Sequence, residues 1–301
     1  MGNVPGLWSR GDAIQRTLAL SVGARRRRSF ADLGAYVAIC AFAVFALFPF
    51  YSMLQTAFTP ARDAYSLHPS AWPAAITWDN FTRALSSPTL PFVLYFRNSL
   101  IVSSMTVVFV IVAGAWGAYA LARMDFAGKS LFGVILLIIQ MFPPVVLVIP
   151  LFVVMARLHL IDSYLGLVLA LVTFNLPFVT WLLRGYFLAL PKEIEDAARI
   201  DGCGRFSALF KIVLPLSAPG VAAVATLAMV SAWNDFLFAF VLINSGSKQV
   251  LATGIAAFGQ SNNDYTALFA MTTLTTIPIV VLFMLFQRYL VGGLAAGSVK
   301  A

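Results

Sequence analysis

The chain has 301 residues, of which 60% are hydrophobic and 11% are charged, and its formal net charge is +8. Soluble globular domains carry about 25% charged residues, so this composition excludes a soluble protein and predicts an integral membrane protein. A nucleic-acid-binding protein is also excluded, because the basic residues are scattered in short connections rather than gathered on one face.

Residues 1–32 form a polar and basic N-terminal extension that includes Arg25 to Arg28. We do not expect a cleavable signal peptide, because the apolar run that follows is too long for a signal-peptide core and no small-residue cleavage site is present. The extension is predicted to be a cytoplasmic tail, which is either disordered or folded into an interfacial helix over residues 7–22.

Six apolar runs follow, and each is long enough to cross a membrane. A helix needs about 20 apolar residues to span a hydrocarbon core of about 30 Å, and the runs lack the two-residue alternation of membrane strands. The predicted fold class is therefore an all-α integral membrane protein, with a six-transmembrane-helix bundle over residues 33–290. The expected helices cover about residues 33–55, 97–122, 131–156, 164–187, 216–243 and 266–290.

The basic residues indicate the orientation, since cytoplasmic connections of membrane proteins are enriched in Lys and Arg. With the N-terminal arginines in the cytoplasm, fifteen of the 20 Lys and Arg residues lie on the cytoplasmic side. The five others are Arg62, Arg83, Arg97, Arg157 and Lys248. Both termini, the connection 188–215 and a short tail over residues 291–301 are thus predicted to be cytoplasmic.

The longest external connection covers residues 56–96 and carries Trp72, Trp78 and Tyr95. Trp and Tyr near the ends of membrane helices commonly anchor in the headgroup region. The connection is therefore either an interfacial anchor or a contact surface for an external partner.

Prolines interrupt three of the predicted helices, at Pro143-Pro144, Pro177 and Pro278. A proline in a helix removes a backbone donor and kinks the axis. Such kinks serve packing alone in many membrane bundles. Three in one small bundle nevertheless favour a moving gate or a break that lines a cavity, and these prolines are our hinge candidates.

Asp235 is the exception to a near absence of acidic residues within the apolar runs, and it follows Asn234 directly. A charge at membrane depth is costly and usually faces a cavity or a partner. The two residues are either a polar pair satisfied within the helix packing or part of a pathway. A single carboxylate gives little support to an ion-coupled transporter, which normally needs a series of them.

Catalytic and metal-binding patterns are missing from the sequence. His68 and His159 lie in predicted loops without a neighbouring acid and nucleophile, and Cys40 and Cys203 form no Cys-x-x-Cys motif. Residues 123–130 end in Gly-Lys-Ser, like a phosphate-binding loop, but Arg123 replaces the first glycine and a membrane helix precedes the segment. We therefore expect no metal, no cofactor and no enzymatic activity on this chain.

Residues 191–219 form a charged segment between two apolar runs. Pro191 is suited to the first turn of a helix, and the acids of this turn favour its positive end. Asp201-Gly202 is a helix stop, because glycine adopts the left-handed conformation readily. A second short helix is predicted over about residues 205–213.

The first of these short helices has an unusual face, formed by Ile194, Ala197, Ala198 and Asp201 at helical spacing. The short alanine side chains allow a helix backbone to lie deep in a groove of another protein. The pattern favours docking of a soluble partner. The alternative is an amphipathic loop that rests on lipid headgroups.

This segment resembles the cytoplasmic docking loop of the permeases of ABC importers, whose pattern is E-A-A-x3-G-x9-I-x-L-P. The matching residues are Asp196-Ala197-Ala198, Gly202 and Ile212-Val-Leu214-Pro215, with both spacings kept. Asp196 departs from the first Glu of the pattern, and Glu195 could supply the longer side chain. The resemblance implies that a coupling helix docks on an ATPase subunit through Glu195, Asp196, Ala197, Ala198, Asp201, Gly202, Ile212, Leu214 and Pro215.

The C-terminal sequence from Phe286 to Lys300 resembles the tail of the maltose- and trehalose-type carbohydrate permeases, which enters the ATPase dimer interface. The implied ATPase contacts are Gln287, Arg288, Gly297 and Lys300. The resemblance extends over about residues 33–301 and implies a location in the inner or plasma membrane of a bacterium or archaeon.

The resemblance further implies half of the translocation pathway for a di- or oligosaccharide, such as trehalose or maltose, or for a polyol. The implied partners are a second homologous permease, two ATPase subunits that bind ATP and Mg²⁺, an extracytoplasmic solute-binding protein and membrane lipid. Candidate pathway residues are Asn175, Asn234 and Asp235. The alternative is a self-contained channel or ion-coupled secondary transporter, which predicts a filter motif or a row of intramembrane ionisable residues, and the sequence has neither.

Overall fold

The computed structural model describes residues 34–66, 72, 75–88, 90–261 and 263–298. Within these residues every regular element is a helix, which confirms the predicted all-helical class. The chain divides into two compact units, Met1–Gln55 and Thr56–Ala301. The predicted N-terminal extension lies outside the described residues.

Four helices in the described part of the chain are long and apolar enough to cross a membrane. They are Gly34–Phe58, α4 (Phe92–Arg123), α7 (Tyr164–Ala189) and the segment Tyr265–Tyr289 of α14 (Tyr265–Ser298). Two bent helix pairs raise the number of candidate spans to as many as six. The α14 helix continues to Ser298, beyond its predicted end at about residue 290.

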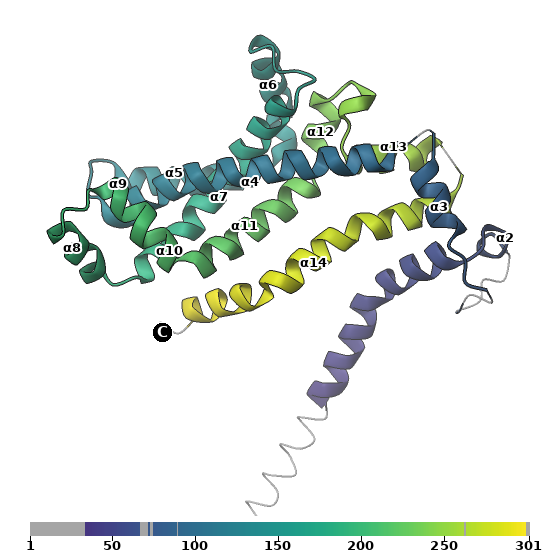
Figure 1. The fold of residues 1–301 in the computed structure, drawn as a ribbon, viewed down its shortest axis with the longest axis horizontal. Coiled ribbons are helices and arrows are strands. Elements are labelled where there is room, and N and C mark those ends of the chain that lie inside the picture. The colour runs from purple at the N-terminus through teal and green to yellow at the C-terminus, as the bar shows by residue number, and fades with distance from the viewer. Residues whose placement is uncertain (1–33, 67–71, 73–74, 89, 262, 299–301) are drawn as a thin grey trace, which may run out of the picture. The chain divides into compact units, whose positions relative to one another are not determined.

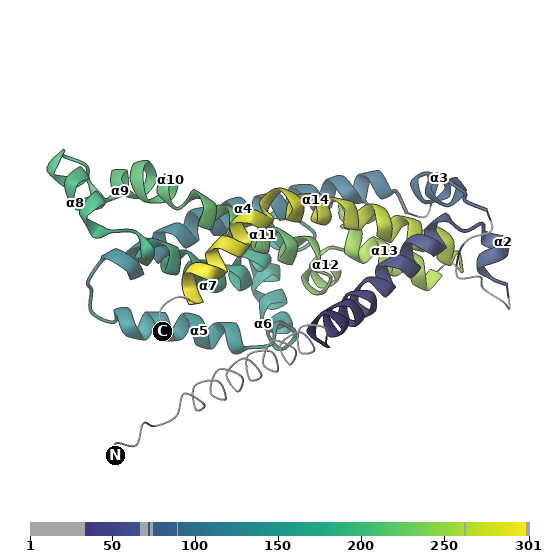
Figure 2. The same cartoon turned by 90° about the horizontal axis from the view of Figure 1, so that it is seen from below.

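The long helices of the second unit lie side by side in both views (Figures 1 and 2). The pair formed by α4 and α7 is packed closely, because a Cβ added to Gly114 of α4 would lie 2.9 Å from Val179 Cγ1 of α7. Helix α11 (Ala218–Trp233) contacts α4, α7 and α14. Small residues at such crossings let membrane helices approach each other.

The predicted helix over residues 131–156 is in fact two helices, α5 (Lys129–Met141) and α6 (Pro144–Arg157), which meet at an angle of 102°. The break has a local cause. Proline disfavours a helical conformation in the residue before it, and Phe142, before Pro143, is extended with ψ of 127°. Pro144 then occupies the first turn of α6, where its missing N–H group removes no hydrogen bond.

The predicted helix over residues 216–243 is also broken. Helix α11 ends at Trp233, with Asn234 as its C-cap, and the short helix α12 (Leu237–Leu242) follows. The Asp235 carboxylate accepts a hydrogen bond of 3.1 Å from the Ala239 backbone N–H. It thereby satisfies one of the donors that the start of a helix leaves free. In contrast, α7 and α14 continue through Pro177 and Pro278.

The predicted external segments contain more structure than loops alone. Helices α2 (Ala61–Ala64) and α3 (Asp79–Ser86) precede α4, and the turn η2 (Gly246–Lys248) and helix α13 (Leu251–Ser261) separate α12 from α14. Phe58 and Phe81 pack against Trp78 with ring centroids 5.0 and 5.4 Å from it. Trp78 therefore contributes to packing in this region as well as being 66% exposed.

The turn before α7 is fastened to the segment before α13 by Asp162. Its carboxylate accepts hydrogen bonds from the Ser245 hydroxyl and backbone N–H and from Lys248 Nζ, the last at 3.0 Å. These donors, led by the Ser245 hydroxyl, hold the pKa of Asp162 well below its usual range. The connection between two helix ends thus depends on one ionised side chain.

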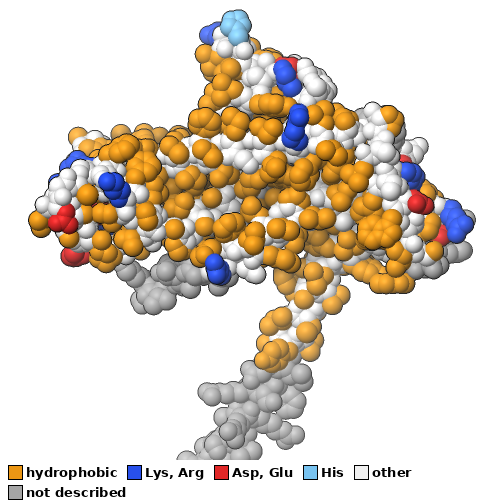
Figure 3. Space-filling view, viewed as in Figure 1, with side chains coloured by type: hydrophobic (Ala, Val, Ile, Leu, Met, Phe, Trp, Pro, Cys, Tyr) orange, Lys and Arg blue, Asp and Glu red, His pale blue; other side chains and the backbone are white. Residues whose placement is uncertain are grey.

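The surface of the second unit is largely apolar (Figure 3). Hydrophobic side chains cover most of the visible face of this unit, and Lys, Arg, Asp and Glu gather mainly near its ends. Phe132, Ile149 and Phe240 are among the large apolar residues that are exposed. Apolar patches of this extent are not left in contact with water by soluble proteins, and the distribution suits a lipid environment.

Candidate functional site: a helical segment fastened to the ends of the long helices

The segment after α7 folds into four short elements, namely α8 (Lys192–Ile200), α9 (Arg205–Ala208), the π-helix η1 (Leu209–Val213) and α10 (Leu214–Leu216). They correspond to the two short helices expected from the sequence. Figure 1 shows α8 and α9 at the end of the second unit that is remote from α3.

Gly202 ends α8 in the predicted manner, with φ of +87°. The Gly202 N–H donates to the Arg199 carbonyl at 3.1 Å, and the Cys203 N–H donates to the Ala198 carbonyl at 3.0 Å. These two bonds define a Schellman motif, which satisfies the last carbonyls of a helix. A Cβ at Gly202 would meet no atom within 4 Å, so glycine is needed here for its backbone conformation and not for space.

A buried ion pair fastens α8 to α4. Arg123, the last residue of α4, donates from Nε to Glu195 Oε1 at 2.5 Å, and Tyr119 Oη donates to Glu195 Oε2 at 3.1 Å. Arg123 also donates from Nη2 to the Leu190 carbonyl at 2.8 Å, directly after α7. The side chains of Arg123 and Glu195 are only 6% and 10% exposed. One arginine therefore joins α4, α8 and the end of α7.

This arrangement divides the predicted docking residues into two groups. Glu195 and Ala198 are buried, and the Glu195 carboxylate is directed at Tyr119 and Arg123 of α4, away from the exposed side of α8. Asp196, Ala197, Asp201 and Gly202 are exposed. The expected four-residue face is thus split, since Ala198 points inward while Ile194, Ala197 and Asp201 lie on the exposed side.

The outer face of α8 is apolar at its centre and end. Ile200 is 87% exposed and Ile194 is 42% exposed, and the small side chain of Ala197 lies between them in sequence. Ile200 was not among the residues selected from the sequence. It could have been found as the apolar residue one turn after Ala197.

The second part of the docking-loop motif, Ile212-Val-Leu214-Pro215 with the η1 residues before it, lies deeper in the structure than the part on α8. Leu209 and Val213 of η1 are completely buried in a cluster that includes Tyr119 of α4 and Phe187 of α7. Among the predicted docking residues of this block, Ile212 and Leu214 are half-buried and Pro215 is exposed. The block therefore anchors the segment among the long helices, next to the Arg123–Glu195 pair.

The candidate pathway residues lie in different surroundings. Asn175 is buried, donates to the Leu171 carbonyl at 2.9 Å and lines a hollow of about 300 Å³. The same hollow is lined by Gln140 and Ser231, which sequence reasoning missed. Asn234 is exposed and Asp235 is half-buried at the break between α11 and α12, and neither is among the residues that line the hollow.

The structure describes part of the C-terminal candidate set. Gln287 donates to the Met284 carbonyl at 3.2 Å, and the Arg288 guanidinium lies 4.6 Å from the centre of the Tyr289 ring. Gly297 belongs to α14, and Lys300 lies outside the described residues. Among the described residues, no group of three His, Cys, Asp or Glu side chains could hold a metal ion.

Comparison with known proteins identifies the family of this chain. Residues 110–295 match the family of binding-protein-dependent transport system inner membrane components. The inner membrane ABC transporter permease protein YcjP of Escherichia coli is 36% identical, with 92% of this chain and 99% of that protein covered. The trehalose/maltose transport system permease protein MalG of Thermococcus litoralis is 35% identical, with 86% and 93% covered.

A solved structure supports the fold. It is a bacterial ABC transporter involved in the import of the acidic polysaccharide alginate, whose matching chain is 22% identical with a TM-score of 0.71. The match covers 96% of this chain and 99% of that chain. The chain belongs to the family of binding-protein-dependent transport system inner membrane components, the permease subunits of ABC transporters.

Proposed function

We propose that this chain is one permease subunit of a carbohydrate importer and that it forms half of the pathway for a di- or oligosaccharide or a polyol. The class of solute is supported by the trehalose/maltose permease that is 35% identical over 260 residues. The chain itself carries no catalytic group in this proposal. ATP and Mg²⁺ bind to two ATPase subunits, and an extracytoplasmic binding protein delivers the solute.

The observation that carries the proposal is the two-sided construction of α8. Its inner side is fixed to α4 by the buried Arg123–Glu195 pair, and its outer side presents Ile194, Ala197 and Ile200. An exposed helix face with two isoleucines on either side of a small alanine suits an apolar groove on a second protein. We assign this face, with Asp196 and Asp201, to the contact with an ATPase subunit.

In the proposed mechanism, closure of the ATPase subunits displaces α8. The displacement reaches α4 through Arg123 and α7 through the Leu190 carbonyl, because both helices are tied to the same guanidinium. The break at Pro143-Pro144, where α5 and α6 meet at 102°, is the strongest of the hinge candidates. Rigid movement of helices about such breaks is a common form of alternating access.

The proposed topology has six spans with both termini in the cytoplasm. Helices Gly34–Phe58, α4, α7 and α14 supply four, and the bent pair of α5 and α6 supplies the fifth. Helix α11, with the short helix α12 that follows its break, supplies the sixth. The α8–α10 segment then faces the cytoplasm together with the C-terminal tail. The hollow lined by Asn175, Gln140 and Ser231 is our candidate for a part of the pathway, which a second homologous permease completes.

Site-specific cross-linking tests the docking assignment with two neighbouring residues. In a background without Cys40 and Cys203, Ala197→Cys places a thiol on the exposed face of α8, and Ala198→Cys places one on the buried face. A bifunctional thiol reagent in native membranes is expected to link Ala197→Cys, but not Ala198→Cys, to an ATPase subunit. Equal yields at both positions, or no ATPase in either product, would overturn the assignment.

A further inference from the structure

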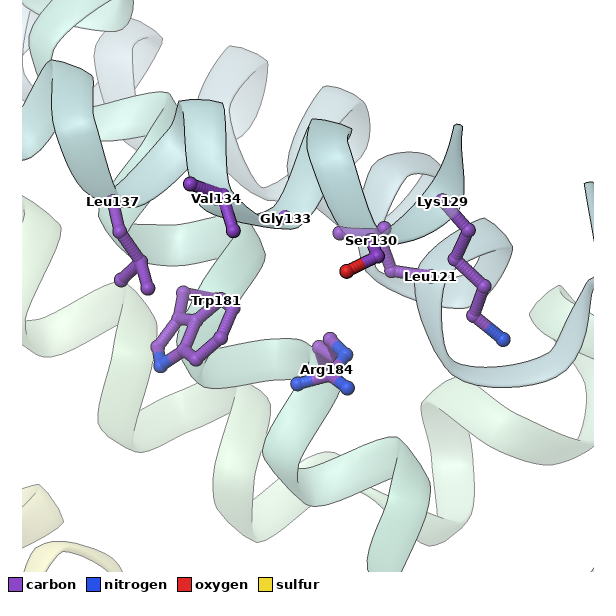
Figure 4. A pocket seen from close by; sticks show the side chains of 8 residues that line it. All are labelled: Leu121, Lys129, Ser130, Gly133, Val134, Leu137, Trp181 and Arg184. Atoms are coloured by element: carbon purple, nitrogen blue, oxygen red, sulfur yellow. The ribbon is translucent and has the colours of Figure 1, made fainter. Parts of the chain in front are cut away.

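An open groove of about 420 Å³ lies between α5 and α7, apart from the docking face and from the hollow at Asn175. It is shown in Figure 4, where the side chains of both helices point toward a common space. Lys129 and Ser130 of α5 and Trp181 and Arg184 of α7 contribute its polar and aromatic lining. Neither the family nor the proposed function assigns a role to these residues.

The groove has a net positive charge. The Arg184 guanidinium lies over the indole of Trp181 at 5.0 Å from the ring centre, which holds it in place without occupying its N–H donors. Within the described part of the chain, no carboxylate forms an ion pair with Arg184. Lys129 has a partner, Asp125 at 3.3 Å, but the Asp125 side chain is fully exposed and does not line the groove.

The lining changes from charged to apolar along the helix axes. Lys129 and Ser130 begin α5, and Gly133 and Leu137 line the groove one and two turns further on. At 1.5 Å per residue, Leu137 lies about 12 Å deeper than Lys129 along the axis. Arg184 lies closer than Trp181 to the end of α7, so the cations of the two antiparallel helices share one end of the groove.

A phospholipid has the same polarity, with an anionic phosphate at the membrane surface and acyl chains directed inward. The charged end of the groove is the end near α8, which the proposed topology places in the cytoplasm. Basic pockets between membrane helices on that side are suited to anionic lipid headgroups. A soluble phosphate would match the cations but not the apolar wall at Gly133 and Leu137.

We propose that this groove binds an anionic phospholipid of the cytoplasmic leaflet. Arg184 and Lys129 bind the phosphate, the Ser130 hydroxyl donates a hydrogen bond to it, and one acyl chain lies along Gly133 and Leu137. The proposal rests on the cytoplasmic placement of this end, but lipid binding is measured independently of transport. Failure of the importer assignment would therefore be recognised separately.

The test uses the complete complex, isolated through a tag on this chain and reconstituted with phosphatidylglycerol or with phosphatidylcholine. Native mass spectrometry then counts the phospholipids that remain bound. Lys129→Gln combined with Arg184→Gln is expected to reduce bound phosphatidylglycerol at least fivefold. The matched control is Arg97→Gln with Arg157→Gln, which removes two exposed cations elsewhere and is expected to retain the lipid.

A second variant tests the apolar end with both cations in place. A Cβ at Gly133 would lie 3.8 Å from the Trp181 ring, so a side chain fits at this position, and Gly133→Leu is expected to occupy the acyl-chain part. It too should lower the count of bound phosphatidylglycerol. Phosphatidylcholine should bind at least fivefold more weakly than phosphatidylglycerol to the unaltered complex, and excess glycerol 3-phosphate should not displace the lipid.

Three results would overturn the proposal. The first is an unchanged lipid count in both groove variants. The second is displacement by glycerol 3-phosphate, which would indicate a site for a soluble phosphate. The third is efficient cross-linking of Val134→Cys, which lines the same groove, to the second permease, which would identify the groove as a subunit interface.

Discussion

The buried pair between Arg123 and Glu195 allows a quantitative prediction for the variant Glu195→Ala. The two side chains are 6% and 10% exposed, so removal of the carboxylate leaves the guanidinium largely shielded from water. Removing one partner of a buried ion pair typically costs about 3–5 kcal/mol. Because Arg123 keeps the Leu190 carbonyl as an acceptor, we expect the lower end, about 3 kcal/mol, which corresponds to roughly a 150-fold change in an equilibrium constant.

The expected effect is local, since Glu195 holds α8 while Leu209 and Val213 anchor the following residues independently. Hydrogen exchange measured by mass spectrometry in nanodiscs reports the opening of α8. Amides of α8 should exchange about 150-fold faster in Glu195→Ala. Asp196→Ala is the matched control, because Asp196 is exposed and surface substitutions usually change stability by less than about 0.5 kcal/mol.

A double variant separates the ion pair from general damage. Replacing both Arg123 and Glu195 by Met removes the charge that would otherwise be stranded, so α8 should exchange no faster than in Glu195→Ala alone. If Glu195→Ala leaves exchange in α8 unchanged, or if Asp196→Ala has the same effect, the reasoning is refuted.

Three further predictions concern single residues. Gly202→Ala should increase exchange in α8 about fivefold, because a left-handed conformation costs a non-glycine residue about 1 kcal/mol; an unchanged rate would argue against the αL turn. Gly220→Ala should lower the free energy of unfolding by about 1–3 kcal/mol, because the added Cβ would lie 2.4 Å from the Tyr186 ring. Gly185→Ala is the control: its added Cβ would have no atom within 4 Å, and the variant should be at least as stable as the wild type. The Asp162 carboxylate stabilises the fold fully above its ordinary pKa of about 4 and progressively less as the pH falls toward its depressed value. The stability difference between the wild type and Asp162→Asn should therefore be constant from about pH 8 to 5 and shrink below about pH 4, and a difference that grew on acidification would contradict this.

The sequence predicted the features that depend on local chemistry. Apolar length identified the long helices, because lipid requires about 20 apolar residues per span. The left-handed turn at Gly202 followed from glycine after a polar helix. The interruption at Pro143-Pro144 was also foreseen, but its size was not, since the angle of 102° depends on packing of α6 that a local pattern does not contain.

The parts that escaped prediction depend on residues far apart in the chain. Glu195 was selected for docking as a substitute for the first Glu of the docking-loop pattern, whereas its carboxylate is buried against Arg123, 72 positions earlier. No spacing rule connects two residues at that separation. Likewise, the apolar residues around Asn234 predicted a continuous helix. Only the structure reveals that the helix breaks there and that the Asp235 carboxylate accepts a hydrogen bond from the Ala239 N–H in the first turn of α12.

The central claim is that this chain couples carbohydrate import to ATP hydrolysis through the exposed face of α8. The most direct measurement is uptake of a labelled oligosaccharide into proteoliposomes that contain the complex isolated through this chain, with its binding protein outside and ATP inside. We predict ATP-dependent accumulation, and its loss in Ile200→Glu, which places a charge on a residue that is 87% exposed. Uptake that proceeds without ATP, or that is unchanged in Ile200→Glu, would contradict the claim.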